Sequence, residues 1–124
     1  MTRLLLVCAG GAVGSGARYL LAVWAARQFG TTFPYGTLLV NVSGCFLLAL
    51  LVQVGTVLSP DLRLALATGL LGGFTTYSTF NYETTAYARE GAWLAATANA
   101  AITLLACFGA GLLGAAAGRL ISSH

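Results

Sequence analysis

Charge is the scarcest property of this sequence. Only 7% of its 124 residues are charged, none of them is lysine, and 58% are apolar. A soluble domain carries about 25% charged residues, so this composition excludes an ordinary cytosolic enzyme and a disordered chain. The positive charge comes from six arginines that are scattered along the chain. No run of them could follow a phosphate backbone, which excludes a nucleic-acid-binding protein.

Side chains that bind metals are also few. Cys8, Cys45 and Cys107 each stand alone in an apolar stretch, and the one histidine, His124, ends the chain. There is no C-x-x-C pair and no histidine near a cysteine. This pattern argues against a disulfide framework or a cysteine–histidine metal site. We expect the cysteines to be small packing residues between helices.

Long apolar runs are the main feature that the sequence does have. They cover about residues 4–26, 36–58, 62–88 and 92–121, and turn-forming residues separate them at Pro34, Pro60 and Gly91. A helix rises about 1.5 Å per residue, so about 20 residues cross a hydrocarbon core about 30 Å thick. The sequence therefore predicts an all-α membrane protein, a single domain spanning residues 1–124 with four transmembrane helices.

The loops carry no charge bias that would set one orientation in the membrane. Four spans put both termini on one side, with Arg3, Arg63 and Arg119; the other side has Arg27 and Arg89, and Arg18 if it snorkels there. The positive-inside rule then gives no preference, which predicts insertion in both orientations and an antiparallel homodimer. A single fixed orientation remains the alternative.

Pairs of glycines predict where helices approach each other closely. A spacing of four residues between small side chains lets helix backbones touch, within a subunit or between subunits. Three such pairs occur, namely Gly10 with Gly14, Gly69 with Gly73, and Gly114 with Gly118.

The third apolar run contains an anomaly. Residues 75–85 are almost all hydroxyl or amide residues, and the adjacent Gly72 and Gly73 come just before them. Adjacent glycines followed by β-branched threonines weaken a helix, which predicts a break near residues 72–76. Backbone carbonyls freed at a break are hard oxygen ligands that suit a small cation. The alternative is that the hydroxyls bond back to their own helix.

Other polar residues lie inside apolar runs. Asn41 is in the second run, and Asn99, Thr103 and Cys107 follow an i, i+4, i+8 spacing that forms one helical stripe in the fourth. Alone, such residues are hydrogen-bonding contacts between helices. Together with Ser78 and Thr79 in the third run, they form a set of neutral donors that suits a compact, strongly hydrated anion.

Two aromatic and two charged residues complete the candidates. Tyr77 and Phe80 are three residues apart and could present ring edges, which carry partial positive charge, to an anion. Packing in the core is the alternative for both rings. Arg18 and Glu83 are charges at membrane depth and are therefore functional candidates.

Three stretches, in this order, resemble the Fluc/CrcB fluoride channels. They read GGAVGSGARY at 10–19, PYGTLLVNVSG at 34–44 and GLLGGFTTYSTFNYE at 69–83. The resemblance implies a fluoride-specific ion channel, not an enzyme, that exports fluoride passively across the bacterial inner membrane. It also implies a four-helix subunit with the third helix broken in mid-membrane, in an antiparallel dual-topology homodimer. A structural sodium ion, which is not transported, is implied at the dimer centre.

The resemblance assigns roles to particular residues. The backbone carbonyls of Gly72 and Thr75 would bind the sodium ion. Arg18 and Glu83 match charged positions near the pore mouths. The residues that match the pore are Asn41, Tyr77, Ser78, Thr79, Phe80 and Thr103.

Two features depart from the family pattern. Tyr77 stands where the first ring of the aromatic pair is usually phenylalanine, and its hydroxyl can redirect the ring by bonding elsewhere. Cys107 stands at a hydroxyl position of the polar stripe on the fourth helix, and Gly111 continues that stripe without a side chain. The lower half of the stripe is therefore weaker than in the family.

Two other functions are open at this stage. A small multidrug antiporter also packs four helices per subunit, but it needs a carboxylate in its first span, where this chain has Arg18 and no acid. A non-transporting subunit of a larger membrane complex would account for the glycine pairs. It would not account for the hydroxyl-rich third run.

Overall fold

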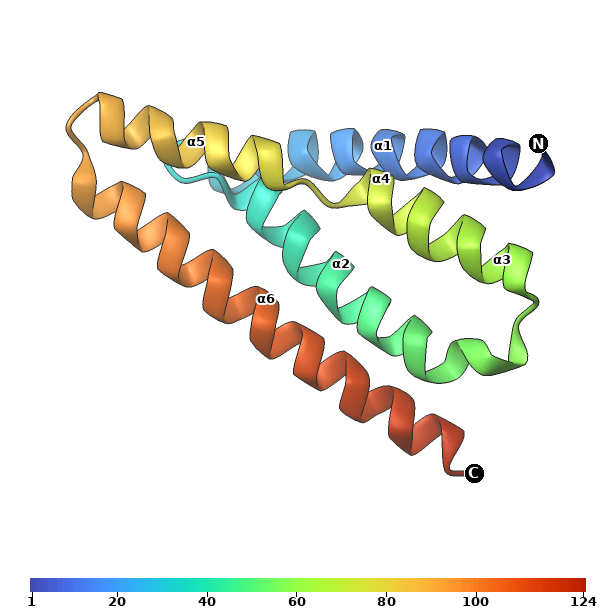
Figure 1. Ribbon diagram of the computed structural model, residues 1–124. Coiled ribbons are helices and arrows are strands. Elements are labelled where there is room, and N and C mark those ends of the chain that lie inside the picture. The colour runs from blue at the N-terminus through green and yellow to red at the C-terminus, as the bar shows by residue number, and fades with distance from the viewer.

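The computed structural model describes residues 1–124 as helices without strands, which confirms the all-helical prediction. Three helices are long: α1 (Thr2–Phe29), α2 (Tyr35–Val54) and α6 (Trp93–Ser122). The chain between α2 and α6 forms shorter segments, namely the 3₁₀ turn η1 (Gly55–Val57), α3 (Pro60–Leu64), the π-helical η2 (Ala65–Leu71), α4 (Gly72–Phe74) and α5 (Tyr77–Arg89). In Figure 1, α2 and α6 lie side by side, and α1 lies alongside the segment that contains α4.

Three stretches are long and apolar enough to cross a membrane. They are α1, residues Tyr35–Val57 and α6. Their presence confirms the prediction of a multi-pass membrane protein. The predicted third run, 62–88, differs from these three because it is divided among α3, η2, α4 and α5.

Backbone contact between α1 and the η2–α4 segment depends on glycine. A Cβ atom added at Gly14 would collide with the carbonyl oxygen of Leu70, and one added at Gly73 would lie 2.6 Å from the carbonyl oxygen of Gly11. Lipid tails are as apolar as leucine, so membrane helices associate through such close packing. The predicted packing of the first two glycine pairs is confirmed within one subunit.

The third glycine pair joins α6 to α2. A Cβ atom at Gly114 would collide with the carbonyl oxygen of Phe46, and one at Gly118 would collide with the side chain of Gln53. Both glycines are buried. The close approach of these two long helices is therefore also a property of a single subunit.

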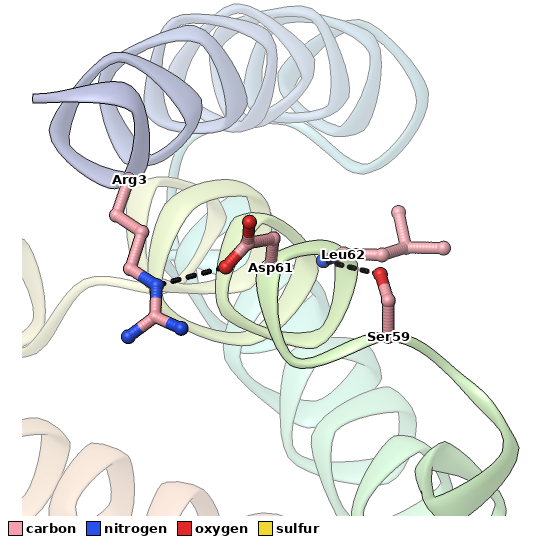
Figure 2. A network of polar contacts seen from close by, with 4 residues as sticks. All are labelled: Arg3, Ser59, Asp61 and Leu62. Atoms are coloured by element: carbon pink, nitrogen blue, oxygen red, sulfur yellow. Dashed lines mark hydrogen bonds and ion pairs between the residues drawn. The ribbon is translucent and has the colours of Figure 1, made fainter.

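The turn before α3 is fixed by its capping residue and by an ion pair to α1. Ser59 caps the helix, because its Oγ accepts a hydrogen bond from the Leu62 N–H at 3.2 Å. Arg3 Nε lies 2.8 Å from Asp61 Oδ1, so the start of α1 is tied to the first turn of α3 (Figure 2). The pair is exposed, with 68% and 49% of the two side chains accessible. Solvent screening therefore limits its contribution to about 1 kcal/mol or less.

The helical path stops between α4 and α5. Thr75 and Thr76 have extended backbone, with ψ angles of 155° and 117°. Both lie inside the 72–76 stretch where the sequence predicts an interruption. The path resumes at once, because Thr76 Oγ1 accepts a hydrogen bond from the Thr79 N–H at 3.2 Å and so caps α5. The interruption has a local cause, because Gly72 and Gly73 weaken the helix before it and Thr76 caps the helix after it.

Replacing Gly14 by alanine tests the close contact between α1 and η2. We expect Gly14→Ala to destabilise the protein by about 1–3 kcal/mol, because the new methyl group meets backbone that can move only with its helix. Gly16 is two residues away on the same helix and has no atom within 4 Å of an added Cβ. Gly16→Ala is therefore the control and should be neutral or stabilising, by up to about 1 kcal/mol from helix propensity. Thermal unfolding in detergent measures both, and equal melting temperatures would contradict the packing.

Candidate functional site

The centre of the site is a pair of hydrogen bonds between Asn41 and Thr76. The Asn41 Nδ2 donates to the Thr76 carbonyl at 2.9 Å, and the Thr76 N–H donates to Asn41 Oδ1 at 2.8 Å. Both residues are buried. A single side-chain amide on α2 therefore satisfies the backbone donor and the backbone acceptor of one residue in the interruption.

This pairing changes the surroundings of nearby carbonyl groups. In a continuous helix the Thr76 N–H would donate to the carbonyl of Gly72, but here it donates to Asn41. The carbonyl of Thr75 accepts no hydrogen bond. Gly72 and Thr75 thus offer carbonyl oxygens of the kind that hard cations prefer, which fits the predicted donor set for sodium.

Thr75 is held from two sides. Its Oγ1 donates to the Leu71 carbonyl at 3.0 Å. On the other side its methyl group rests on Gly44 of α2, where an added Cβ would collide with Thr75 Cγ2. The side chain of Thr75 is therefore fixed by sterics on α2 and by its own helix turn.

A cavity of about 670 Å³ lies between α2, α6 and the interruption. It brings together four of the six predicted pore residues, since Asn41, Tyr77, Phe80 and Thr103 all line it. Thr75 and Cys107 also reach it. None of its lining residues is charged. The cavity is a largely apolar space with a few neutral polar groups.

The two aromatic rings at this cavity form a tilted pair. The ring centroids of Tyr77 and Phe80 are 5.7 Å apart, with 59° between the planes. Tyr77 is 77% exposed in the single subunit, whereas Phe80 is half-buried. The Tyr77 hydroxyl makes no hydrogen bond within the subunit, so nothing there redirects its ring.

Ser78 and Thr79 do not line this cavity. Their hydroxyls lie near Thr76 instead, with Oγ–Oγ1 and Oγ1–Oγ1 distances of 3.4 and 3.0 Å. Each helix residue turns by about 100°, so the residues between Tyr77 and Phe80 face another side of α5. Thr79 faces a second cavity of about 280 Å³, which Arg18 also lines.

The Phe80 turn is connected to α6 by a chain of hydrogen bonds. Asn99 is only 1% exposed, and its Nδ2 donates to Thr84 Oγ1 at 2.9 Å. The Thr84 hydroxyl in turn donates to the Phe80 carbonyl at 2.8 Å. Thr103 donates to Asn99 Oδ1 at 3.5 Å. Asn99 and Thr84 thus fix α5 against α6. The four-residue spacing from Thr103 identifies Asn99 in the sequence, whereas nothing distinguishes Thr84 from its neighbouring threonines.

The two membrane-depth charges do not form an ion pair with each other. Arg18 is at the second cavity, whereas Glu83 is at a third cavity of about 270 Å³. Thr37 Oγ1 donates to Glu83 Oε1 at 2.6 Å, and Glu83 Oε2 is buried without a partner. Neither charge reaches the cavity that Asn41 and Phe80 line.

The chain is similar to one family of proteins and to several relatives that share one name. A family described as "CrcB-like protein, Camphor Resistance (CrcB)" matches residues 5–115. A protein named fluoride-specific ion channel FluC from Anaeromyxobacter dehalogenans is 58% identical over 113 residues, which cover 89% of this chain and 90% of that protein. Proteins of the same name from Sorangium cellulosum and Shewanella baltica are 49% identical over 122 residues and 45% over 109. The match to the Sorangium protein covers 96% of both chains. The match to the Shewanella protein covers 86% of this chain and 88% of that protein.

The family match and the fold lead to the same class of protein. The matched residues include the whole of α2, the interruption at Thr75 and Thr76, and all of α5. Three stretches long and apolar enough to span a membrane accompany them. This multi-pass membrane protein belongs to the CrcB family.

Proposed function

We propose that this protein is a fluoride-specific channel that lets fluoride leave the cell passively across the inner membrane of a bacterium. The observation that carries the proposal is the uncharged cavity in which Asn41, Thr103 and Phe80 meet. The relatives named as fluoride-specific ion channels support it. The active form is an antiparallel dual-topology homodimer, in which the faces exposed in one subunit are covered by the other.

The cavity can replace part of the water shell of an anion. An asparagine amide has two N–H donors, and Asn41 uses one of them on Thr76. The second is free to donate to fluoride. The Thr103 hydroxyl makes only a long 3.5 Å bond to Asn99, so it can turn to an anion at little cost. The Phe80 ring adds a positive edge at the same cavity.

The absence of charge in this wall favours conduction over trapping. A channel site must bind an ion well enough to admit it and weakly enough to release it. A fixed cation in a dry cavity would hold fluoride too strongly, and Arg18 lies at a separate cavity. In this proposal Arg18 attracts anions toward a vestibule through its long-range field. Thr79 lines the same cavity as Arg18, and Ser78 adjoins it through the Thr76 hydroxyl. Glu83 is a structural charge near the other mouth.

A structural sodium ion at the dimer axis is part of the proposal. The free Thr75 carbonyl and the Gly72 carbonyl, whose helical donor is engaged elsewhere, support it. Two copies related by a two-fold axis would together provide four carbonyl oxygens. The ion would neutralise the partial negative charge of these carbonyls and hold the two interruptions together.

A cation antiporter is less consistent with this site. Exchange of a cationic drug for protons needs a carboxylate in the drug cavity. No acidic residue lines the cavity at Asn41, and Glu83 lies at another one. The role of a non-transporting subunit would not account for a cavity lined by neutral polar and aromatic side chains.

Fluoride efflux from liposomes that contain only this protein tests the channel. We expect fluoride efflux without chloride efflux. Asn41→Leu should slow it by roughly ten- to hundredfold, because a hydrogen bond to a charged group contributes about 1.5–3 kcal/mol. Phe80→Ile should also slow it, because it keeps the bulk of the side chain and removes the positive ring edge. Tyr77→Phe is the control: it keeps the ring and loses a hydroxyl without a partner in the subunit, so efflux should persist.

The dimer must be shown to form in each variant, by its size in detergent. Asn41 also holds Thr76, so Phe80→Ile separates loss of the pathway from loss of the fold. Wild-type rates for both Asn41→Leu and Phe80→Ile would mean that fluoride does not pass this cavity. Equal fluoride and chloride efflux in the unmodified protein would contradict specificity.

Removing sodium tests the cation site. We expect the melting temperature of the dimer to rise with sodium concentration, because an ion that binds only the folded form stabilises it by mass action. N-methylglucamine at equal ionic strength is the control, since its size prevents binding between carbonyls. If the dimer melts at the same temperature in both salts, the protein binds no structural sodium.

Labelling a C-terminal tag from each side of the membrane tests dual topology. The balanced loop arginines predict that an impermeant reagent labels part of the protein in intact cells and the rest only after the membrane is opened. Adding arginine to one loop side should shift the distribution toward one orientation. Labelling from one side alone in the unmodified protein would rule out the antiparallel dimer.

A further inference from the structure

Two cysteines from different helices line the same cavity. Cys45 lies on α2 one turn after Asn41, and Cys107 lies on α6 one turn after Thr103. The two thiols are near neighbours, with no hydrogen bond joining them. Both side chains line the cavity of about 670 Å³. The sequence predicts separate packing residues here, but the fold brings two thiols together.

This pair contains only sulfur ligands. The protein has no group of three or more histidine, cysteine or acidic residues that could hold a metal. Structural zinc sites need four such ligands, and hard cations need oxygen. Two thiolates instead match a soft ion with a filled d shell, which accepts two sulfurs in a line.

Charge decides between monovalent and divalent soft ions. The cavity wall around the thiols has no charged residue. Two thiolates with a monovalent ion carry one net negative charge, whereas two thiolates with a divalent ion are neutral. An uncompensated charge in a largely apolar space is costly, so a soft divalent cation is favoured.

We propose that Cys45 and Cys107 form a two-thiolate site for a soft divalent cation, and that the bound ion blocks the fluoride pathway. In the binding step two S–H bonds break, two sulfur–metal bonds form, and two protons leave to solvent without any redox change. The blocking part rests on the proposed function, since it requires fluoride to pass one turn away at Asn41 and Thr103. The binding part does not.

Mercuric ion is the probe, and binding is measured directly. Cys8 is an exposed third thiol, so Cys8→Ser is the background for every sample. We expect intact-mass measurement to show one mercury per subunit, loss of both free thiols, and retention of the metal through a wash with a monothiol. In the same background, Cys45→Ser and Cys107→Ser leave one thiol each and should lose mercury in that wash. Two mercury ions per subunit, or loss of metal from the two-thiol protein, would overturn the site.

Fluoride efflux in liposomes tests the consequence. We expect mercuric ion to remove most of the efflux of the two-thiol protein, and a dithiol chelator to restore it. Each serine variant should keep its own untreated rate after the monothiol wash. Metal bridged between both thiols with undiminished efflux would overturn the block. A protein without fluoride efflux before treatment would overturn the proposed function instead, while the mass measurement would still decide the site.

Discussion

The two hydrogen bonds between the Asn41 side chain and the Thr76 backbone are the interaction on which the rest of the site depends. A chain that leaves helical geometry among apolar groups exposes a donor and an acceptor with no water to satisfy them, at a cost of several kcal/mol. A carboxamide can satisfy both at once, because it offers a donor and an acceptor in one plane. Aspartate would lack the donor, and leucine would lack both.

That interaction also determines what the neighbouring groups can do. Because the Thr76 N–H is engaged by Asn41, the Gly72 carbonyl loses its helical donor. Because Thr76 is extended, its hydroxyl is free to cap α5, which aims Tyr77 and Phe80 toward α6. The glycine contacts of α1 and α6 give this arrangement a rigid frame, since backbones in contact cannot slide without collision.

Much of the fold could be predicted from the sequence, because long apolar runs with few charges have few alternatives. The interruption could be located to a few residues, since Gly72 and Gly73 weaken a helix and the threonines after them support a cap. The glycine pairs identified close contacts, but spacing alone could not say that each pair packs within one subunit. Hydropathy could not show that the third run is divided into α3, η2, α4 and α5.

The site was less predictable than the fold. Asn41 and Thr103 could be chosen because polar residues in apolar runs are rare, and Phe80 because of its spacing from Tyr77 and the resemblance to the family. The three residues do meet. Ser78 and Thr79 were grouped with them from composition, whereas the turn of α5 directs them elsewhere. The hydrogen bond between Asn99 and Thr84, and the placement of Cys45 and Cys107 on one cavity, depend on how two helices are aligned. No spacing within one helix carries that information.

The contact between Gly44 and the methyl group of Thr75 links two positions that are distant in sequence. A chain with alanine at position 44 has no room for that methyl group, whereas serine at 75 would keep the hydroxyl bond to Leu71 and remove the collision. The two positions are therefore coupled, because alanine at position 44 fits only after the methyl group at position 75 has been removed. Thr75 also provides a carbonyl that accepts no hydrogen bond. The residue at position 44 of α2 is therefore restricted by the geometry of the interruption, and not by the hydrophobicity of α2 itself.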